Sequence, residues 1–200
     1  IAMTKFLYWM KKNNTNLNLN EIKAKKKLEN FRKMRANYLF PSFPTISGSG
    51  PNSAIIHYNV NKKTNRKLSK NEVYLCDSGG QYKYGTTDVT RTICFSKTNQ
   101  NIKNIFTRVL KGHIAVFNTH LNKIKFGSDI DQKARHSLKE VSLDYNHGTG
   151  HGVGHFLSVH EGPQAISKYN RIKIQPGMIL SNEPGYYKKN DFGIRIENLI

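Results

Sequence analysis

Hydrophobic residues recur with a helical spacing in four parts of the chain, and these parts predict four helices. The predicted helices cover residues 1–12, about 20–37, 101–119 and a segment that begins at Ser128. In the second of them, Ile22, Phe31 and Met34 form an apolar stripe among lysines. Ser128 stands three residues before Asp131, which resembles a capping box at the start of the fourth helix.

Short apolar runs bounded by glycine, proline or asparagine predict strands between these helices. The predicted strands lie at 54–58, 72–80, 81–95, 176–184 and 193–200. We expect the first to be largely buried, with His57 near its end. In the second, alternation places Val73, Leu75 and Asp77 on one face, so a carboxylate points where apolar side chains point. Such a carboxylate is costly unless it is paired or bound to a metal.

Two predicted hairpins, one in each half of the chain, each carry two acids. Asp77 and Asp88 are separated by eleven positions, and a turn near Gly85 would bring both within reach of one ion. Glu183 and Glu197 lie on two strands that a polar, turn-like segment joins. We therefore expect an α+β protein with two related halves that face each other across a shared site.

The segment 147–163 concentrates histidine and glycine. It holds four of the eight histidines within fourteen residues, interleaved with glycines. Glycine lets a backbone approach a ligand closely, and imidazole is both a common metal ligand and a proton carrier near neutral pH. Any one of these histidines alone could equally be a surface residue, and glycine also marks ordinary turns. Together with the acids of the two hairpins, the cluster indicates a site.

The charge of the chain suggests a different hypothesis, a nucleic-acid partner. The formal net charge is +19, from 32 Lys and Arg against 13 Asp and Glu. However, the lysines are spread among asparagines and form no single stripe with aromatic residues, which favours a solvated surface without nucleic-acid binding. No apolar run approaches the length of about eighteen residues that a membrane span needs. Two cysteines, Cys76 and Cys94, indicate no disulfide framework and favour a reducing compartment.

Four carboxylates and an imidazole that converge on one pocket require cations, because they cannot all stay ionised side by side. Oxygen ligands with one nitrogen suit Mn, Zn, Co or Fe(II). This number of carboxylates favours a pair of divalent ions about 3.5 Å apart, which can acidify a water enough to attack a carbonyl. Taken alone, Glu183 or Glu197 could equally be an exposed strand carboxylate.

Eight short motifs, in their order and spacing, resemble the metallopeptidases of the pita-bread fold. Within these, the chain is similar to the eukaryotic-type aminopeptidase P (Xaa-Pro aminopeptidase) family, from about Phe6 to its end. The motifs are Phe43-Pro-Thr-Ile-Ser, Asn52-Ser-Ala-Ile-Ile-His-Tyr58, Asp77-Ser-Gly, Gly85-Thr-Thr-Asp-Val-Thr-Arg-Thr92, His147-Gly-Thr-Gly-His-Gly-Val-Gly154, Val159-His-Glu-Gly-Pro163, Glu183-Pro-Gly-Tyr-Tyr187 and Gly193-Ile-Arg-Ile-Glu-Asn198. The resemblance implies two pseudo-symmetric α+β halves with a curved antiparallel sheet.

Carried over residue by residue, the resemblance implies a site for two divalent metal ions. Manganese is the expected element, with zinc, cobalt and iron(II) as alternatives. Asp77 would chelate one ion, while Asp88 and Glu197 would bridge both. His151 and Glu183 would complete the second ion, and Glu183 would also be the general base that takes a proton from the attacking water.

The resemblance also implies contacts with a substrate. His57 and His160 match histidines that contact the substrate and stabilise the tetrahedral intermediate, so they are expected to be catalytic as well. His147 matches a histidine that lines the pocket for proline. Arg195 is expected to orient ligand carboxylates and to bind substrate. His155 departs from the family pattern, in which a small residue is expected, and we interpret it as local packing.

The implied activity is removal of the N-terminal residue from peptides with proline at the second position, by attack of a metal-bridging hydroxide on the Xaa-Pro bond. Prolidase or methionine aminopeptidase would use the same five ligands, although the run 147–154 and the pair Tyr186-Tyr187 favour aminopeptidase P. A third alternative is a non-catalytic homologue that binds peptides. The resemblance further implies a homodimer of the full-length protein, and we expect a cytoplasmic location.

We expect residues 1–200 to form a single catalytic domain that is part of a longer chain. The resemblance implies amino-terminal domains before it and further residues after it. The first ten residues are apolar but lack a basic region and a small-residue cleavage site. They therefore look like part of a helix and not like a signal peptide.

Overall fold

The computed structural model describes residues 1–13, 18–122, 124 and 126–200. Four α-helices are present in these ranges: α1 Ala2–Asn13, α2 Glu21–Lys33, α3 Gln100–Phe117 and α4 Gly127–Lys139. The side chains of Asn20 and Asn99 cap α2 and α3, because each accepts a hydrogen bond from a backbone N–H of the first turn. All four predicted helices are therefore confirmed, although α2 ends at Lys33 and not near residue 37. Within the described residues, none of the helices is long and apolar enough to cross a bilayer.

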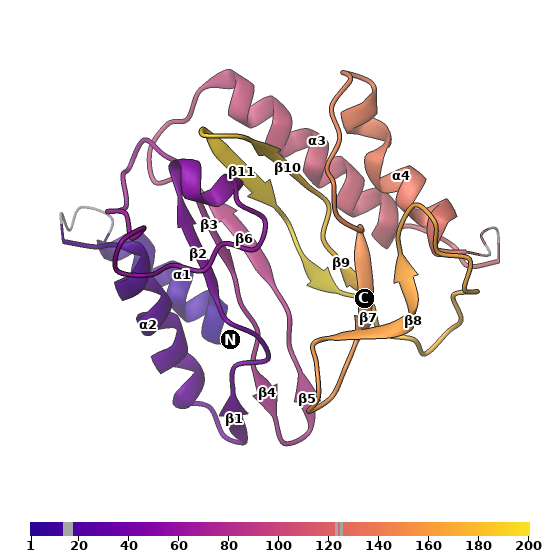
Figure 1. Cartoon of the computed structure of the whole chain (residues 1–200), viewed down its shortest axis with the longest axis horizontal. Coiled ribbons are helices and arrows are strands. Elements are labelled where there is room, and N and C mark those ends of the chain that lie inside the picture. The colour runs from indigo at the N-terminus through magenta and orange to yellow at the C-terminus, as the bar shows by residue number, and fades with distance from the viewer. Residues whose placement is uncertain (14–17, 123, 125) are drawn as a thin grey trace.

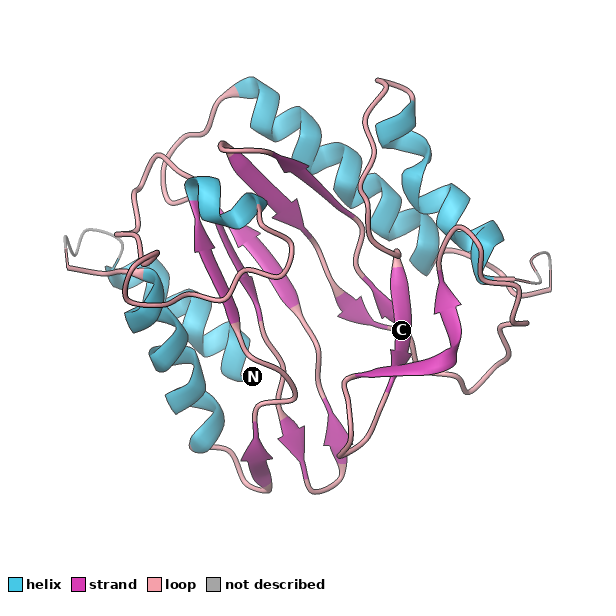
Figure 2. Cartoon of the chain, in the orientation of Figure 1, coloured by secondary structure: helices cyan, strands magenta, loops and turns pink. Residues whose placement is uncertain are grey.

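Short strands lie between and after these helices (Figure 2). They are β1 Tyr38–Phe40, β2 Ile46–Ser49, β3 Tyr74–Asp77, β4 Gln81–Tyr82, β5 Gly85–Thr86, β6 Thr90–Ile93, β7 Gly150–Val153, β8 His160–Ile166, β9 Ser181–Asn182, β10 Gly185–Lys188, β11 Phe192–Arg195 and β12 Asn198–Leu199. Every strand pair is antiparallel: β2-β3-β6, β1-β4-β5, β7-β8, β9-β12 and β10-β11. A 3₁₀ helix, η1 Gly50–Ala54, follows β2.

The first half of the chain packs α1 and α2 against the sheet β2-β3-β6. Phe6, Met10 and Leu28 from the helices are fully buried beside Tyr74 and Cys76 of β3. Figure 1 shows these two helices at the left of the strand layer and α3 and α4 at its upper right. The buried apolar side chains hold β3 in place, and the end of β3 is where Asp77 lies.

The second half packs α3 and α4 against the last strands. Val109 of α3 and Leu138 of α4 are fully buried together with Ile194 of β11. Ala134 of α4 packs in a neighbouring cluster with Ile166 of β8. Each half thus supplies two helices and a set of antiparallel strands, as the distribution of hydrophobic residues predicts.

Hydrogen bonds join the strands of the two halves into one layer. The strand β11 runs beside β6, because the Thr92 hydroxyl donates to the Arg195 carbonyl oxygen at 2.8 Å. Further along, Glu197 N donates to the Thr90 carbonyl oxygen at 3.3 Å, and Glu183 N donates to the Thr149 carbonyl oxygen at 2.8 Å. The hairpin formed by the last four strands therefore lies between β6 and β7 (Figure 1).

The prediction of a strand at residues 54–58 is wrong. Residues 50–54 form η1 and a turn follows. Pro51 suits the first turn of this helix, and the Ser53 hydroxyl donates to the Gly50 carbonyl oxygen at 2.6 Å, which closes the turn. Ile55 is 53% exposed, so the apolar run does not form a buried strand.

The capping box predicted between Ser128 and Asp131 is also wrong. Helix α4 begins one residue earlier, and Asp129 accepts a hydrogen bond from Phe126 N at 3.1 Å. Asp131 is instead buried, and it accepts hydrogen bonds from Arg135 at 2.8 Å and from the Thr149 hydroxyl at 2.6 Å. This carboxylate therefore ties α4 to the segment that leads into β7.

Candidate metal centre

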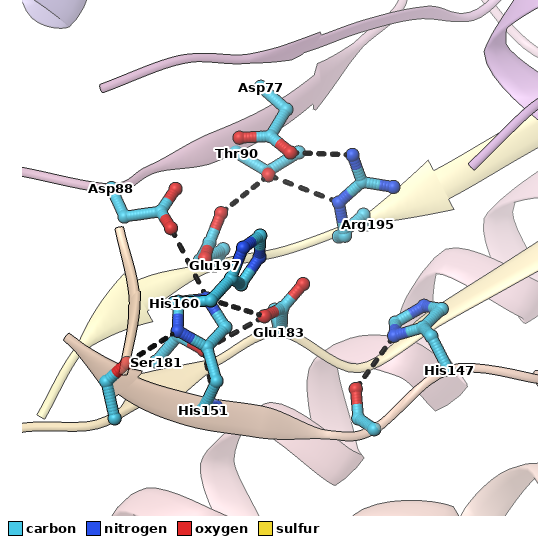
Figure 3. Close-up of polar contacts among 12 residues, drawn as sticks. Asp77, Asp88, Thr90, His147, His151, His160, Ser181, Glu183, Arg195 and Glu197 are labelled. Carbon is cyan, nitrogen blue, oxygen red and sulfur yellow. Dashed lines mark hydrogen bonds and ion pairs between the residues drawn. The ribbon is translucent and has the colours of Figure 1, made fainter. Parts of the chain in front are cut away.

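Two interruptions in the last hairpin place Glu183 and Glu197 beside each other. Within the predicted strand 176–184, Leu180 bridges Gly152 and Ser181–Asn182 pairs with β12, and pairing resumes at Gly185–Lys188 after Pro184. The opposite strand is interrupted at the same level, between Arg195 and Asn198. Both glutamates occupy these gaps, and Figure 3 shows their carboxylates directed towards Asp88 and His151.

Asp77 and Asp88 reach the same place from the first half. Asp77 is the last residue of β3 and is paired with Thr90 of β6, so Asp88 lies just beyond its partner. The intervening strands β4 and β5 turn between Tyr82 and Gly85, which confirms the predicted hairpin. Both carboxylates are buried, with exposed fractions of 8% and 6%.

His151 enters from β7. A Cβ atom on Gly150 would lie 1.9 Å from the Ser181 carbonyl oxygen, so only glycine lets β7 approach β9 this closely. As a result, His151 Nε2 lies 3.3 Å from Glu183 Oε1 and 3.4 Å from Asp88 Oδ2. Its Nδ1 is 2.8 Å from the Gly152 carbonyl oxygen, and this contact fixes the proton on Nδ1 and leaves Nε2 to act as a ligand.

All five predicted ligands line one cavity of about 220 Å³. One ligand atom from each of Asp88, His151 and Glu197 lies within 4.8 Å of the others. Asp77 Oδ1 and Asp88 Oδ1 are buried and have no hydrogen-bond partner among the described residues. Buried carboxylate oxygens without donors are costly, so this arrangement fits divalent cations.

The electrostatics of the cavity support the same conclusion. Burial raises the pKa of Asp77 and, well above its ordinary range, that of Glu197. Burial also raises the pKa of Glu183 to about 7, against the charges of Arg195 and His151, which lower it. Burial alone would lower the pKa of His151, but the hydrogen bond with Asp88 and the charge of Glu183 raise it. Cations would relieve the mutual repulsion of these carboxylates.

Arg195 balances part of the negative charge. Its guanidinium donates to Asp77 Oδ2 at 2.7 Å and to the Thr90 hydroxyl at 3.3 Å (Figure 3). It also donates to the Tyr187 hydroxyl at 2.7 Å. Arg195 is 1% exposed. Burial alone would lower its pKa, but Tyr187 and Asp77 raise it, so the guanidinium stays charged. The contact with Asp77 supports the predicted role of Arg195 in orienting a ligand carboxylate, and both this role and substrate binding by Arg195 stay predictions.

The three histidines predicted to contact substrate also line the cavity. His147 Nδ1 donates to the Gly148 carbonyl oxygen at 2.7 Å, and its Nε2 accepts from the Tyr187 hydroxyl at 2.8 Å. Burial and the charge of Arg195 lower the pKa of His147 to about 3, so the ring is neutral. His160 stacks edge-on to His151 with ring centroids 4.3 Å apart, and burial lowers its pKa. His57 lies on the turn after η1.

Two hydroxyl groups of the site were not predicted from the sequence. Ser181 donates to Glu183 Oε1 at 2.8 Å and accepts from His151 N at 2.9 Å, so it joins two of the ligands. Thr90 donates to Glu197 Oε2 at 2.7 Å. Each lies two positions from an acid on an alternating segment, and this spacing is the signal that could have identified them.

His155 lies outside the cavity, in agreement with the interpretation as local packing. Its Nδ1 is 3.0 Å from Gln81 Nε2, and its ring packs edge-on against Phe156 at 4.5 Å between centroids. Its contacts hold the β7–β8 loop against β4 and β5.

The model of metallopeptidase family M24 matches residues 1–200. Aminopeptidase P2 from Arabidopsis thaliana is 48% identical over the whole chain, which covers 28% of that protein. The crystal structure of X-prolyl aminopeptidase from Caenorhabditis elegans, described as a cytosolic enzyme with a di-nuclear active site, superimposes with a TM-score of 0.93 at 39% identity. The chain covers 33% of it, and 99% of the chain is matched.

A prolidase from Pyrococcus horikoshii also shares the fold, with a TM-score of 0.85, 28% identity, the whole chain matched and 55% of that prolidase covered. The chain thus spans about a third or less of the aminopeptidase relatives and about half of the prolidase. Its two halves and continuous strand layer form the pita-bread fold predicted from the motifs. By sequence and by structure, this chain belongs to metallopeptidase family M24.

Proposed function

We propose that this chain is the catalytic domain of a metal-dependent aminopeptidase that removes the N-terminal residue from peptides with proline at the second position. The observation that carries the proposal is the convergence of Asp77, Asp88, His151, Glu183 and Glu197 on one cavity. The relatives named aminopeptidase P and X-prolyl aminopeptidase support the choice of substrate.

The five converging residues would hold two divalent ions, for which we propose Mn²⁺. Mn²⁺ suits a site of four carboxylates and one imidazole, and Zn²⁺, Co²⁺ and Fe²⁺ share parts of this preference. When bound, the ions would acidify the attacking water and polarise the scissile carbonyl group. The neighbour described as having a di-nuclear active site supports the number of ions.

Glu183 is the proposed general base. Its Oε1 accepts a hydrogen bond from Ser181, which fixes the orientation of the carboxylate and leaves Oε2 to take the proton of the attacking water. Without ions, burial raises the pKa of Glu183 to about 7, and bound ions would lower it, so that the carboxylate is ionised and able to accept a proton near neutral pH. Glu183 could then pass the proton to the imino nitrogen of the leaving proline.

His57 and His160 are the proposed groups that stabilise the developing negative charge on the substrate carbonyl oxygen. Both line the cavity. His147 is neutral and its Nε2 is occupied by Tyr187, so it offers the substrate its ring edge and face and not a proton. The cavity wall also contains Phe43, Ile56 and Val159, whose apolar surfaces suit a proline ring.

We also propose that the full-length protein is cytosolic and forms a homodimer. The description of the Caenorhabditis elegans enzyme as cytosolic supports the location. A single catalytic domain over residues 1–200 within a longer chain is consistent with the shares of the relatives that it covers. The lysines that give the net charge of +19 are spread along the chain among asparagines, which favours a solvated surface over a nucleic-acid site.

Hydrolysis of an Xaa-Pro-Xaa tripeptide by the metal-loaded protein tests the proposed function. We expect turnover with Mn²⁺, its loss with a chelator, and its loss by about a thousandfold or more in Glu183→Gln with folding retained. Glu161→Gln is the matched control, since Glu161 is exposed on β8 and lies outside the cavity lining. Cleavage of Xaa-Pro dipeptides alone would indicate a prolidase. A folded protein that takes up no metal would instead indicate a non-catalytic homologue.

A further inference from the structure

A second buried carboxylate, Glu21, lies outside the metal centre. It is the first residue of α2 and is fully buried. Its Oε1 accepts hydrogen bonds from Ser49 N at 2.7 Å and Asn52 Nδ2 at 3.0 Å. Its Oε2 accepts from the Tyr58 hydroxyl and from Arg66 N, both at 2.9 Å, and from Asn52 Nδ2 at 3.1 Å. A buried carboxylate is tolerated because donors on every side satisfy it.

These donors belong to the segment that carries His57. Asn52 lies in η1 before His57, and Tyr58 follows it directly. Ser49 is the last residue of β2, and Arg66 lies further along the same connection between β2 and β3. One carboxylate on α2, which packs beside β2 (Figure 1), therefore contacts four points between Ser49, the last residue of β2, and Arg66, and residues 50–66 form no strand.

The opposite side of η1 is held by the strand that leads to the metal centre. Gly193 N donates to the Ser53 hydroxyl at 2.8 Å in a buried contact. A Cβ on Gly193 would lie 1.9 Å from the Ser53 carbonyl oxygen, so no larger residue permits this approach. Gly193 belongs to β11, as does Arg195. The turn with His57 is thus clamped between α2 and the strand that orients Asp77.

We propose that Glu21 is a positioning residue for catalysis: it fixes His57 at the cavity by holding Asn52 and Tyr58 on either side of it. The proposal rests on the proposed function, because His57 is expected to act on the substrate. Displacing a catalytic group by about 1 Å can lower turnover by about 100-fold, even when the changed residue is remote from the chemistry. Glu21 never touches the substrate and acts only through His57.

The variant Glu21→Gln tests the proposal with almost no change in volume. The amide NH₂ would face Ser49 N–H and Asn52, or else Tyr58 and Arg66 N–H, so donors would meet a donor on one side. In the metal-loaded protein we expect kcat on an Xaa-Pro tripeptide to fall about 10- to 100-fold, with KM changed about twofold or less. Bound metal is expected to stay at the wild-type level, because Glu21 contacts none of the ligands.

The matched control is Glu72→Gln. Glu72 contacts the same segment, accepting from Arg66 Nη2 at 2.8 Å and from the Ser49 hydroxyl at 3.5 Å, but it is partly exposed and holds neither Asn52 nor Tyr58. We expect kcat to stay within about twofold of wild type, since an exposed ion pair stabilises little. Tyr58→Phe removes a single donor to Glu21 and serves as the milder variant if Glu21→Gln does not fold.

A double-mutant cycle with His57→Ala separates positioning from general stability. If Glu21 acts through His57, adding Glu21→Gln or Tyr58→Phe to His57→Ala lowers kcat no further. Losses that multiply in the double variant would overturn the proposal, because they would show an effect independent of His57. An unchanged kcat in both Glu21→Gln and Tyr58→Phe would overturn it as well.

Hydrogen exchange keeps this test distinct from the test of the proposed function. We expect backbone amides of residues 50–58 to exchange faster in Glu21→Gln than in wild type or Glu72→Gln. If the wild-type protein cleaves no Xaa-Pro peptide, the proposed function fails while exchange still decides whether Glu21 holds the segment. Unchanged exchange in this segment would overturn the positioning role whatever the activity.

Discussion

Arg195 Nη2 lies 2.7 Å from Asp77 Oδ2, which joins two side chains that are 118 residues apart in the sequence. Arg195 belongs to the second half of the fold and Asp77 to the first. Both are buried, so the ion pair is shielded from salt and its partners are held in one orientation. This contact leaves Asp77 Oδ1 free to face the cavity, where it has no partner among the described side chains and backbone groups.

Substituting Arg195 should therefore weaken metal binding without removing a ligand. Lysine keeps the charge but supplies one nitrogen in place of the three that contact Asp77, Tyr187 and Thr90. We expect Arg195→Lys to lower the affinity for Mn²⁺ by about 10- to 100-fold, the usual cost of losing a group that orients a ligand. Calorimetric titration of the metal-free protein measures this, and wild-type affinity in Arg195→Lys would contradict it.

Metal binding should also stabilise the fold, and the effect of Glu197→Gln on stability should depend on whether the metal is present. At an ion concentration about 100 times Kd, binding adds about 2.7 kcal/mol, which corresponds to a rise in Tm of roughly 5–10 °C for a domain of this size. Without ions, the buried carboxylates repel one another. We therefore expect Glu197→Gln to be at least as stable as wild type in chelator but to lose the increase in Tm with Mn²⁺. A Glu197→Gln protein that gains as much from Mn²⁺ would contradict the ligand assignment.

The convergence of the ligands could be predicted from sequence because it follows from short-range rules. Alternation along β3 placed Asp77 among apolar side chains, and the turn near Gly85 returned Asp88 to it. The pairing of β9 with β12 and of β10 with β11 likewise brings Glu183 next to Glu197. Hairpin geometry alone thus brings each pair together, and one close approach at Gly150 adds the imidazole.

The parts that sequence did not predict depend on long-range contacts. The apolar run 54–58 has the composition of a strand, but Glu21 captures Asn52 and Tyr58 from 31 and 37 positions away and forces a turn. Asp131 has the spacing of a capping residue, yet Arg135 and Thr149 bind it in the interior. In both segments a buried carboxylate overrides the local pattern, and local spacing cannot reveal which donors it will meet.

Because Arg135 and Asp131 form a buried ion pair, we expect replacement of Arg135 to destabilise the fold strongly. Arg135 also donates to the carbonyl oxygens of Tyr145 and His147 at 2.6 and 2.7 Å, so it supports the approach to β7. Arg135→Met leaves Asp131, which is 1% exposed, without its cation, and we expect a loss of about 3–5 kcal/mol in the free energy of unfolding.

The ion pair between Arg108 and Glu140, whose side chains are 28% and 52% exposed, provides the control for Arg135. Arg108→Met should cost about 1 kcal/mol or less by comparison. Urea unfolding of both variants measures the difference, and equal losses would contradict the structural role of Arg135.

The lowered pKa of His113 makes part of the stability depend on pH in the mildly acidic range. The residue is buried in α3, near Asn198 and Arg91, and burial together with the charge of Arg91 lowers its pKa from 6.5. Because the folded state resists protonation, the contribution of His113 to stability is fully present above pH 6.5 and declines as the pH falls through the lowered pKa. The raised pKa values of Asp77, Glu183 and Glu197 act in the opposite sense, so we expect the free energy of unfolding of wild type to fall between pH 7 and about pH 5 relative to that of His113→Gln. Urea unfolding at both pH values measures this, with the exposed His136→Gln as control. An equal fall in His113→Gln and wild type would assign the acid sensitivity to other groups.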